Sequence, residues 1–319
     1  MFIAQMTLAF VLPSPGALAD PAKIGVLGPA PPPALAALRE GIAAQLAKRG
    51  LVPDRDFTFE TRSADGKPER LSGLAKELAD AHVAVIATSS YPAVRAARET
   101  TSTIPIVSIN AGEPVETGLA ASLAHPGGNV TGLSDMSSEL SAKRLELLHL
   151  VVPGMKRVAM LWNADDLGMS GRYKAASAAA TAMGIGVQAL GVREPDDFNA
   201  AFAAMSREMP DGILMVTDVL TLLNRARVFD FAAAHRLPAI YEFDNLARDG
   251  GLMSYGADGK EVFSRVGDLI ARILKGAKPA GLPFEQPTLF RLVINQKTAD
   301  TIGLSLPREL LLRADEVIE

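Results

Sequence analysis

Short apolar runs alternate with longer amphipathic stretches along most of this chain. From Lys23 onward, the short apolar run 24–27 is predicted to be a strand, and the β-branched run 83–87 is typical of a strand buried in a parallel sheet. Between such runs, residues 34–49 repeat apolar positions at helical spacing, and Gly50 follows where a helix commonly ends. Strands that alternate with helices in this way predict right-handed βαβ crossovers and a parallel sheet.

The alternation of strands and helices starts again after Asp135. Because the second block has the same order of elements as the first, we expect an α/β protein with two doubly wound parallel-sheet lobes. The second block consists of predicted helices at 139–151, 171–183, 197–207 and 220–235, and predicted strands at 158–162, 187–190, 212–216 and 239–241.

The segment after residue 241 decides how the two lobes are connected. It contains a predicted strand at 252–255, a helix at 260–275 and an extended stretch at 286–294. We expect the chain to cross between the lobes near residues 135, 254 and 285, which makes a multi-crossover hinge. The alternative is two tandem domains joined once near 135. The expected units are a leader at 1–22, a first lobe at 23–135 plus about 255–285, and a second lobe at 136–254 plus part of 286–319.

The first residues have the pattern of an export signal. An apolar run at 2–12 is followed by the helix-breaking residues 13–16 and by an A-x-A cleavage pattern at 17–19. The run is short for a membrane span, so a cleaved leader and a periplasmic location are expected. A basic segment before the apolar run is missing, and the alternative is an apolar N-terminus that is not a leader.

Composition excludes several classes of function. The 319 residues are 48% hydrophobic and 21% charged, they carry a formal net charge of −4, and they contain no cysteine. Disulfides and thiolate sites are therefore excluded, and a nucleic-acid partner is disfavoured. The four histidines form no metal-spaced pair, and there is no G-x-S-x-G or phosphate-binding loop. We expect no enzymatic activity, no cofactor and no metal.

Residues 105–135 place polar side chains at the ends of two strands. The predicted strand 106–108 runs into Glu113, and a turn at 126–129 precedes a second short strand that ends in Ser134 and Asp135. In open α/β sheets the ligand binds just beyond the carboxyl ends of the strands. A ligand site is therefore expected here.

This segment resembles a family of ABC-importer substrate-binding proteins that includes tryptophan and tyrosine uptake proteins. Further resemblance runs through 143–163, 236–256 and 273–319, and Glu113 stands where the family usually has Asp. The resemblance implies the type I periplasmic binding protein fold, with two lobes, three crossovers and a ligand in the cleft. It also implies a monomer whose partners are a small-molecule ligand (an amino acid or a related carboxylate) and an inner-membrane ABC permease.

The candidate ligand contacts follow predicted strand ends in both lobes. A carboxylate is expected to bind near Ser89 and Ser90, although a serine before a helix is also an ordinary cap. Asp135 and Asp218 come from different lobes and are candidates to hold one ligand amine, with a solvated loop acid or a helix cap as the alternative for each. The complete candidate set is Ser89, Ser90, Tyr91, Glu113, Ser134, Asp135, Asn163, Asp218, Tyr241 and Glu242.

Aromatic residues near strand ends suit a flat ligand. Tyr91, Trp162, Tyr241 and Phe243 all occupy such positions, with plain core packing as the alternative. Taken with the resemblance, these features predict a solute-binding protein that captures a small, amino acid-like ligand, aromatic or a related carboxylate, by hinge closure. The alternative is a ligand-sensing subunit that presents the same pocket to a membrane sensor kinase.

Overall fold

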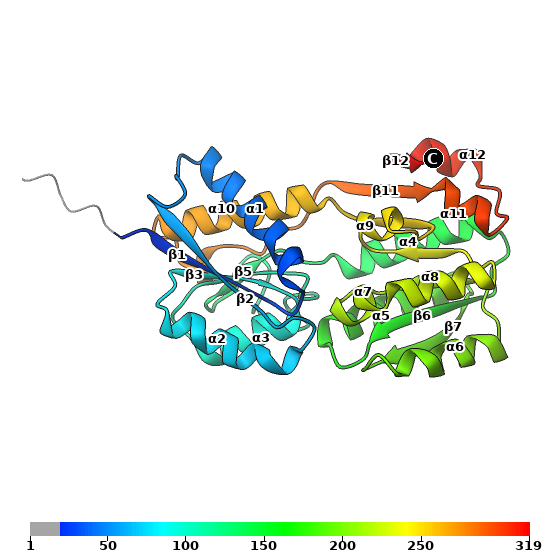
Figure 1. Cartoon of the computed structure of the whole chain (residues 1–319), viewed down its shortest axis with the longest axis horizontal. Helices are drawn as coiled ribbons and strands as arrows, with labels where there is room; N and C mark the ends of the chain where they lie inside the picture. Colours follow the sequence, from blue (N-terminus) through cyan, green and yellow to red (C-terminus); the bar gives the residue numbers. More distant parts are fainter. Residues whose placement is uncertain (1–19) are drawn as a thin grey trace, which may run out of the picture.

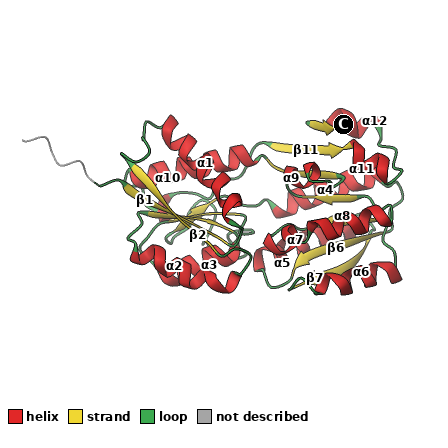
Figure 2. Cartoon of the chain, viewed as in Figure 1, coloured by secondary structure: helices red, strands yellow, loops and turns green. Residues whose placement is uncertain are grey.

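Two α/β lobes lie end to end along the long axis of the molecule (Figure 1). The structure is a computed structural model, and it describes residues 20–319. Each lobe contains one sheet with helices on both of its faces (Figure 2). Residues 1–19 of the predicted leader lie outside the described residues. Ala22, the expected last residue of the leader, is the first residue of strand β1. None of the helices in residues 20–319 is long and apolar enough to cross a membrane.

The sheet of the N-terminal lobe has five parallel strands in the order β2-β1-β3-β4-β5. The central strand β1 is buried on both faces, as its apolar sequence requires. Helices α1 and α10 cover one face of the sheet, and α2 and α3 cover the other. The bounds are β1 (Ala22–Gly28), α1 (Pro32–Lys48), β2 (Phe57–Ser63), α2 (Leu71–Asp80), β3 (Val85–Ser89), α3 (Tyr91–Thr100), β4 (Ile106–Ile109), β5 (Val130–Gly132) and α10 (Gly259–Leu274).

Helix α10 comes from a distant part of the sequence and packs closely on α1. A methyl group at Gly41 would lie 2.5 Å from Cβ of Phe263, and one at Gly267 would lie 2.6 Å from Cβ of Gln45. These two glycines therefore set the short separation between the helices. Gln45 also donates a hydrogen bond to Asp268 at 2.8 Å, which fixes the register of α1 against α10.

The sheet of the C-terminal lobe has seven strands in the order β12-β11-β10-β9-β8-β6-β7, with β11 antiparallel to β10. Strands β6 to β10 alone repeat the order of the N-terminal sheet, which explains the repeated pattern in the sequence. The bounds of these strands are β6 (Arg157–Asn163), β7 (Gly186–Val192), β8 (Gly212–Met215), β9 (Ala239–Tyr241), β10 (Met253–Ala257), β11 (Phe290–Asn295) and β12 (Glu316–Ile318).

Helices cover both faces of this second sheet as well. One core is formed with α4, α5, α11 and α12, and the opposite core with α6, α8 and α9. The bounds are α4 (Ser137–Val151), α5 (Leu167–Ala182), α6 (Asp197–Arg207), α7 (Val219–Leu223), α8 (Arg225–Ala234), α9 (Asp244–Arg248), α11 (Gln296–Thr301) and α12 (Arg308–Arg313).

The chain passes between the two lobes three times, after β5, after β10 and before β11. The first and third crossovers are bonded to each other, because Ser134 N donates to Glu285 O and Glu285 N donates to Gly132 O, both at 2.9 Å. The predicted fold class, with two doubly wound lobes and a multi-crossover hinge, is confirmed. The alternative of tandem domains joined once is wrong.

One predicted helix differs from the structure. The stretch 220–235 forms two helices, α7 and α8, with a break at Asn224, whose side chain donates to Leu220 O at 2.9 Å. Here a side chain competes for a helical carbonyl, which periodicity does not reveal. The described chain also has a 3₁₀ turn, η1 (Pro68–Arg70), directly before α2 and another, η2 (Pro279–Gly281), in the third crossover.

Candidate ligand-binding site

The strand order reverses at one point in each lobe. The reversal lies between β1 and β3 in the N-terminal sheet and between β6 and β8 in the C-terminal sheet. Ligands of open α/β sheets bind beyond the carboxyl ends of the strands at such points. Ser89 ends β3, and Asn163 ends β6, so two predicted site residues lie at these reversals.

The carboxyl ends of the two sheets face each other at close range. Gly112 follows β4 and Gly168 lies in α5 of the other lobe, and a methyl group at Gly112 would lie 2.8 Å from Cα of Gly168. A methyl group at Gly66, after β2, would lie 3.1 Å from the side chain of Leu223 in α7. The lobes therefore touch directly, in a closed arrangement.

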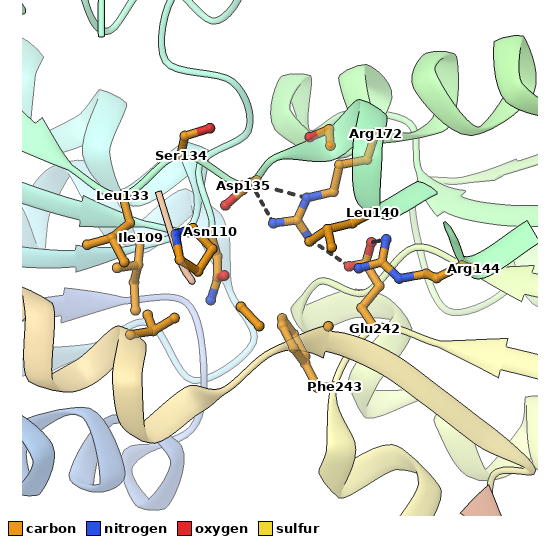
Figure 3. Close-up of a pocket in the computed structure, with 15 residues that line it drawn as sticks. Ile109, Asn110, Leu133, Ser134, Asp135, Leu140, Arg144, Arg172, Glu242 and Phe243 are labelled. Carbon is orange, nitrogen blue, oxygen red and sulfur yellow. Dashed lines mark hydrogen bonds and ion pairs between the residues drawn. The ribbon is translucent and has the colours of Figure 1, made fainter. Parts of the chain in front are cut away.

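A cavity of about 40 Å³ lies between the lobes beside the crossovers (Figure 3). Its lining comes from the ends of β4 and β9, from the starts of α4 and α10, from α5, and from all three crossovers. The polar and aromatic members of the lining are Asn110, Ser134, Asp135, Ser137, Arg144, Arg172, Glu242 and Phe243.

Four buried charges form one network in the wall of this cavity. Arg172 donates through Nη2 to Asp135 at 2.5 Å and through Nη1 to Glu242 at 2.5 Å. Arg144 donates through Nη1 to the other oxygen of Glu242 at 3.0 Å, and Thr217 N donates to Glu242 at 3.0 Å. Each of the four charged side chains is at most 6% exposed. The charges are therefore mutually compensated, as burial requires.

Arg144 retains an unused donor on the cavity side. Its Nε donates to Tyr255 O at 2.8 Å and its Nη1 is bound to Glu242, whereas Nη2 has no hydrogen-bond partner among the described residues. Burial lowers the pKa of Arg144, and the charge of Glu242 opposes this shift. A further anionic partner would stabilise this guanidinium.

Three buried hydroxyls at strand ends also lack partners in the described protein. They are the hydroxyls of Ser90 after β3, Ser137 at the start of α4 and Thr217 after β8. Ser137 lines the cavity and is 4% exposed. A buried hydroxyl without a partner costs free energy, and such groups in native proteins commonly serve a ligand.

The backbone is strained around the same strand ends. Ser90, Asn110 and Met136 have φ values of 89°, 53° and 47°, although none of them is glycine. They follow β3, β4 and β5 respectively. Left-handed backbone at non-glycine residues is concentrated at functional sites, where the surrounding structure maintains it.

Glu113 organises the first crossover and the start of α4. Its Oε2 accepts from Ser134 Oγ at 2.7 Å, and its Oε1 accepts from Ser137 N at 2.5 Å. The carboxylate thus satisfies a free backbone amide of a helix N-terminus, a favourable position for a negative charge.

The predicted site residues fall into three groups in the structure. Ser134, Asp135 and Glu242 line the cavity, and Glu113 bonds to two residues that border it. A second group, Ser89, Ser90 and Tyr91, lies at the carboxyl end of β3, on the side of the N-terminal sheet that faces the other lobe. These three residues do not line the cavity.

The remaining predicted residues are engaged elsewhere. Asn163 donates to Asp218 at 2.6 Å, and Asp218 also caps α7 by accepting from Thr221 N at 2.9 Å. With Asp135 bound to Arg172, the expected clamp of one amine between Asp135 and Asp218 finds no support in this arrangement. Tyr241 is 1% exposed and packs in the core on the far side of β9.

The prediction from sequence did not include the two arginines, Ser137 or Asn110. A signal for Arg144 does exist, because Leu140, Arg144 and Leu148 occupy one helical face and all three are buried. An arginine within such an apolar face indicates a buried ion pair or a ligand contact. Arg172 follows an irregular, alanine-rich pattern that gives no comparable signal.

Two facing lobes, three crossovers and a polar cavity between opposed strand ends define the class of two-lobed solute-binding proteins. The sequence matches the family described as ABC transporter substrate binding protein over residues 23–318. The chain belongs to this family.

Relatives of known identity agree in fold and length. A tyrosine-binding protein of Clostridioides difficile is 24% identical over 287 residues, which cover 89% of this chain and 82% of the relative. A domain from Streptococcus pneumonia solved in complex with L-Trp is 25% identical, with 94% of this chain and 100% of that chain covered and a TM-score of 0.87. The ligand-free, open structure of a substrate-binding protein from Clostridium difficile is 24% identical, with coverages of 93% and 99% and a TM-score of 0.70. The fold is that of type I periplasmic binding proteins.

Proposed function

We propose that this protein is the extracytoplasmic receptor of an ABC importer and that it captures an amino acid, with an aromatic side chain favoured, by closing its two lobes. The observation that carries the proposal is the unused polar groups at the facing strand ends. They include a guanidinium donor on Arg144 and hydroxyls on Ser137, Ser90 and Thr217. The tyrosine-binding relative and the L-Trp complex support an aromatic amino acid.

The chemistry of the cavity suits a zwitterion. Arg144 Nη2 and Ser137 Oγ supply donors for an α-carboxylate. Asp135 uses only Oδ2 in its bonds to Gly112 and Arg172, so its Oδ1 supplies a carboxylate oxygen near the first crossover for an α-ammonium. Leu140 and Phe243 provide apolar lining for a side chain.

Binding also requires lobe movement. A cavity of about 40 Å³ holds only a few water molecules, so the lobes have to move apart from this arrangement both to admit an amino acid and to make room for it. A ligand favours closure only through contacts that it makes better in the closed state, and the proposed contacts come from both sides of the crossovers. Micromolar affinity requires about 8 kcal/mol, which a few charge-assisted hydrogen bonds and buried apolar surface supply.

The same proposal includes location and partner. We expect export by the predicted leader, a periplasmic monomer, and recognition of the closed form by an inner-membrane ABC permease. Family membership supports the transport role.

Calorimetric titration of protein beginning at Asp20 tests the proposal. L-Tryptophan, L-tyrosine and L-phenylalanine are compared with tryptamine, which lacks the carboxylate, and with indole-3-propionate, which lacks the amine. We expect one of the amino acids to bind with micromolar affinity and its truncated analogues to bind at least about 100-fold more weakly, because each leaves buried polar groups unpaired. Equal binding of an analogue, or no binding of any amino acid, contradicts the proposal.

A further inference from the structure

The C-terminal lobe contains a second cavity, which shares no lining residue with the cavity between the lobes. Its walls come from α8, from the loop before β10 and from α11 (elements shown in Figure 1). Its volume is about 340 Å³, which lies within the range of small-molecule sites. It lies beside the amino ends of β9 and β10, whereas the interlobe cavity lies at their carboxyl ends.

Tyr241 gives this cavity a buried polar group. The side chain is 1% exposed, and its ring meets Phe229 edge to face at a centroid distance of 5.3 Å. Its hydroxyl has no hydrogen-bond partner among residues 20–319, and burial alone raises the pKa of the phenol. Buried tyrosine hydroxyls usually find a partner, so this one is available to a ligand.

Small residues keep the space open. A methyl group at Gly251 would lie 2.6 Å from the ring of Tyr241, and Gly250 has a φ of 122°, which disfavours any other residue. On the opposite wall, α8 contributes Ala226 and Ala233, where longer side chains would fill the cavity.

The acidic side chains of the lining differ in their availability. Asp249 is held by Arg225 at 2.8 Å. Asp230 makes no side-chain hydrogen bond or ion pair with another described residue, and it is exposed at the rim of the cavity. No lysine, arginine or histidine lines this cavity in the described chain. A cationic group is therefore the complementary one.

We infer that this cavity is a second binding site and that it takes a small primary amine with a compact apolar body. The ammonium group binds Asp230 and the hydroxyl of Tyr241, and the apolar body lies against Phe229 and the alanines of α8. The ring faces of Phe229 and Tyr241 further favour a nearby cation.

Saturation-transfer NMR and calorimetry with benzylamine test the inference, with benzoate as the anionic comparison. Asp230→Asn removes the charge, Tyr241→Phe removes only the hydroxyl, and Ala233→Leu fills the cavity. Ala234→Leu is the matched control, because Ala234 is exposed on the same helix and does not line the cavity. Circular dichroism and thermal unfolding show which variants are folded.

We expect benzylamine but not benzoate to bind the wild-type protein. Binding should weaken several-fold in Asp230→Asn and in Tyr241→Phe, vanish in Ala233→Leu and persist in Ala234→Leu. Amino acid binding between the lobes should be unchanged in all four. No binding of benzylamine, or equal binding to Ala233→Leu, overturns the site. Loss in Ala233→Leu with undiminished binding to Asp230→Asn overturns the assigned class of ligand.

Discussion

Asp135 and Arg172 form a buried ion pair between the first crossover and helix α5. Arg172 donates to one carboxylate oxygen of Asp135 through Nη2 at 2.5 Å and through Nε at 3.1 Å, and both side chains are 6% exposed. The same oxygen accepts from Gly112 N in the loop after β4. One carboxylate thus connects both lobes in this arrangement, and we expect the pair to favour closure as well as folding.

Removing Arg172 should strongly destabilise the protein. In Arg172→Met, Asp135 and Glu242 lose their shared cation while they remain buried, and the free energy of unfolding should fall by about 3–5 kcal/mol. Chemical denaturation measures this loss. Arg49→Met is the control, because the pair of Arg49 with Asp268 lies on the surface and its removal should change the free energy of unfolding much less. Equal losses of unfolding free energy in Arg172→Met and Arg49→Met would show that burial of the ion pair does not determine the cost of removing the arginine.

Gly112 should be required for full closure. Gly112→Ala brings a methyl group to 2.8 Å from Cα of Gly168, so the lobes have to separate. Gly118→Ala is the matched control, because its φ of 70° carries similar strain and nothing lies within 4 Å. Small-angle scattering should show a larger radius of gyration for Gly112→Ala but not for Gly118→Ala. The affinity of Gly112→Ala for the amino acid should fall about tenfold or more, because separated lobes weaken ligand contacts in both lobes. Indistinguishable scattering from the two variants argues against a tight contact between Gly112 and Gly168 in the closed protein.

The hydroxyl of Ser137 should contribute to affinity and not to stability. It has no partner in the described protein, so Ser137→Ala removes no internal hydrogen bond. We expect the dissociation constant for the amino acid to rise roughly tenfold, the effect of one lost hydrogen bond. Ser254→Ala is the control, because Ser254 is also a buried hydroxyl without a partner but does not line the cavity. Calorimetry should find the amino acid affinity of Ser254→Ala unchanged. An equal change of affinity in both variants would show that Ser137 does not contact the ligand.

The start of α5 should make stability depend on pH. Asp166 is 2% exposed and accepts from Gly168 N at 2.8 Å. Burial, with the charge of Asp218, raises the pKa of Asp166 from 3.8 to about 6. Between about pH 4 and 6 the folded state therefore binds more protons than the unfolded state, and this contribution to stability is lost as the pH rises.

Asp166→Asn tests this dependence. Asparagine is as good an N-cap as aspartate and carries no charge. At pH 7.5 the variant should be more stable than the wild type by about 2 kcal/mol, and the difference should disappear near pH 4. Denaturant unfolding of both proteins at the two pH values provides the comparison. A difference that does not change with pH would mean that the carboxyl does not titrate in this window.

Much of the fold could be predicted because strands such as 83–87 are apolar on both faces and are bounded by polar strand ends. Those ends also led to Ser134, Asp135 and Glu242. The face of the sheet toward which the Tyr241 side chain points could not be predicted. Strand β9 has three residues and is buried on both faces, so it shows no alternation of polar and apolar residues from which to assign the faces. The ion pairs of Asp135 and Arg144 join residues 37 and 98 positions apart, respectively, and no local pattern reports such contacts.

The central claim is that an amino acid draws the two lobes together. Because the chain has no cysteine, Lys67→Cys with Leu223→Cys places two spin labels at unique sites on opposite lobes, beside the contact of Gly66 with Leu223. Pulsed electron spin resonance then measures the distance between the labels with and without the amino acid that binds in calorimetry. We predict a longer, broader distribution without ligand and a single short distance with it. A distribution that the amino acid leaves unchanged would contradict the account.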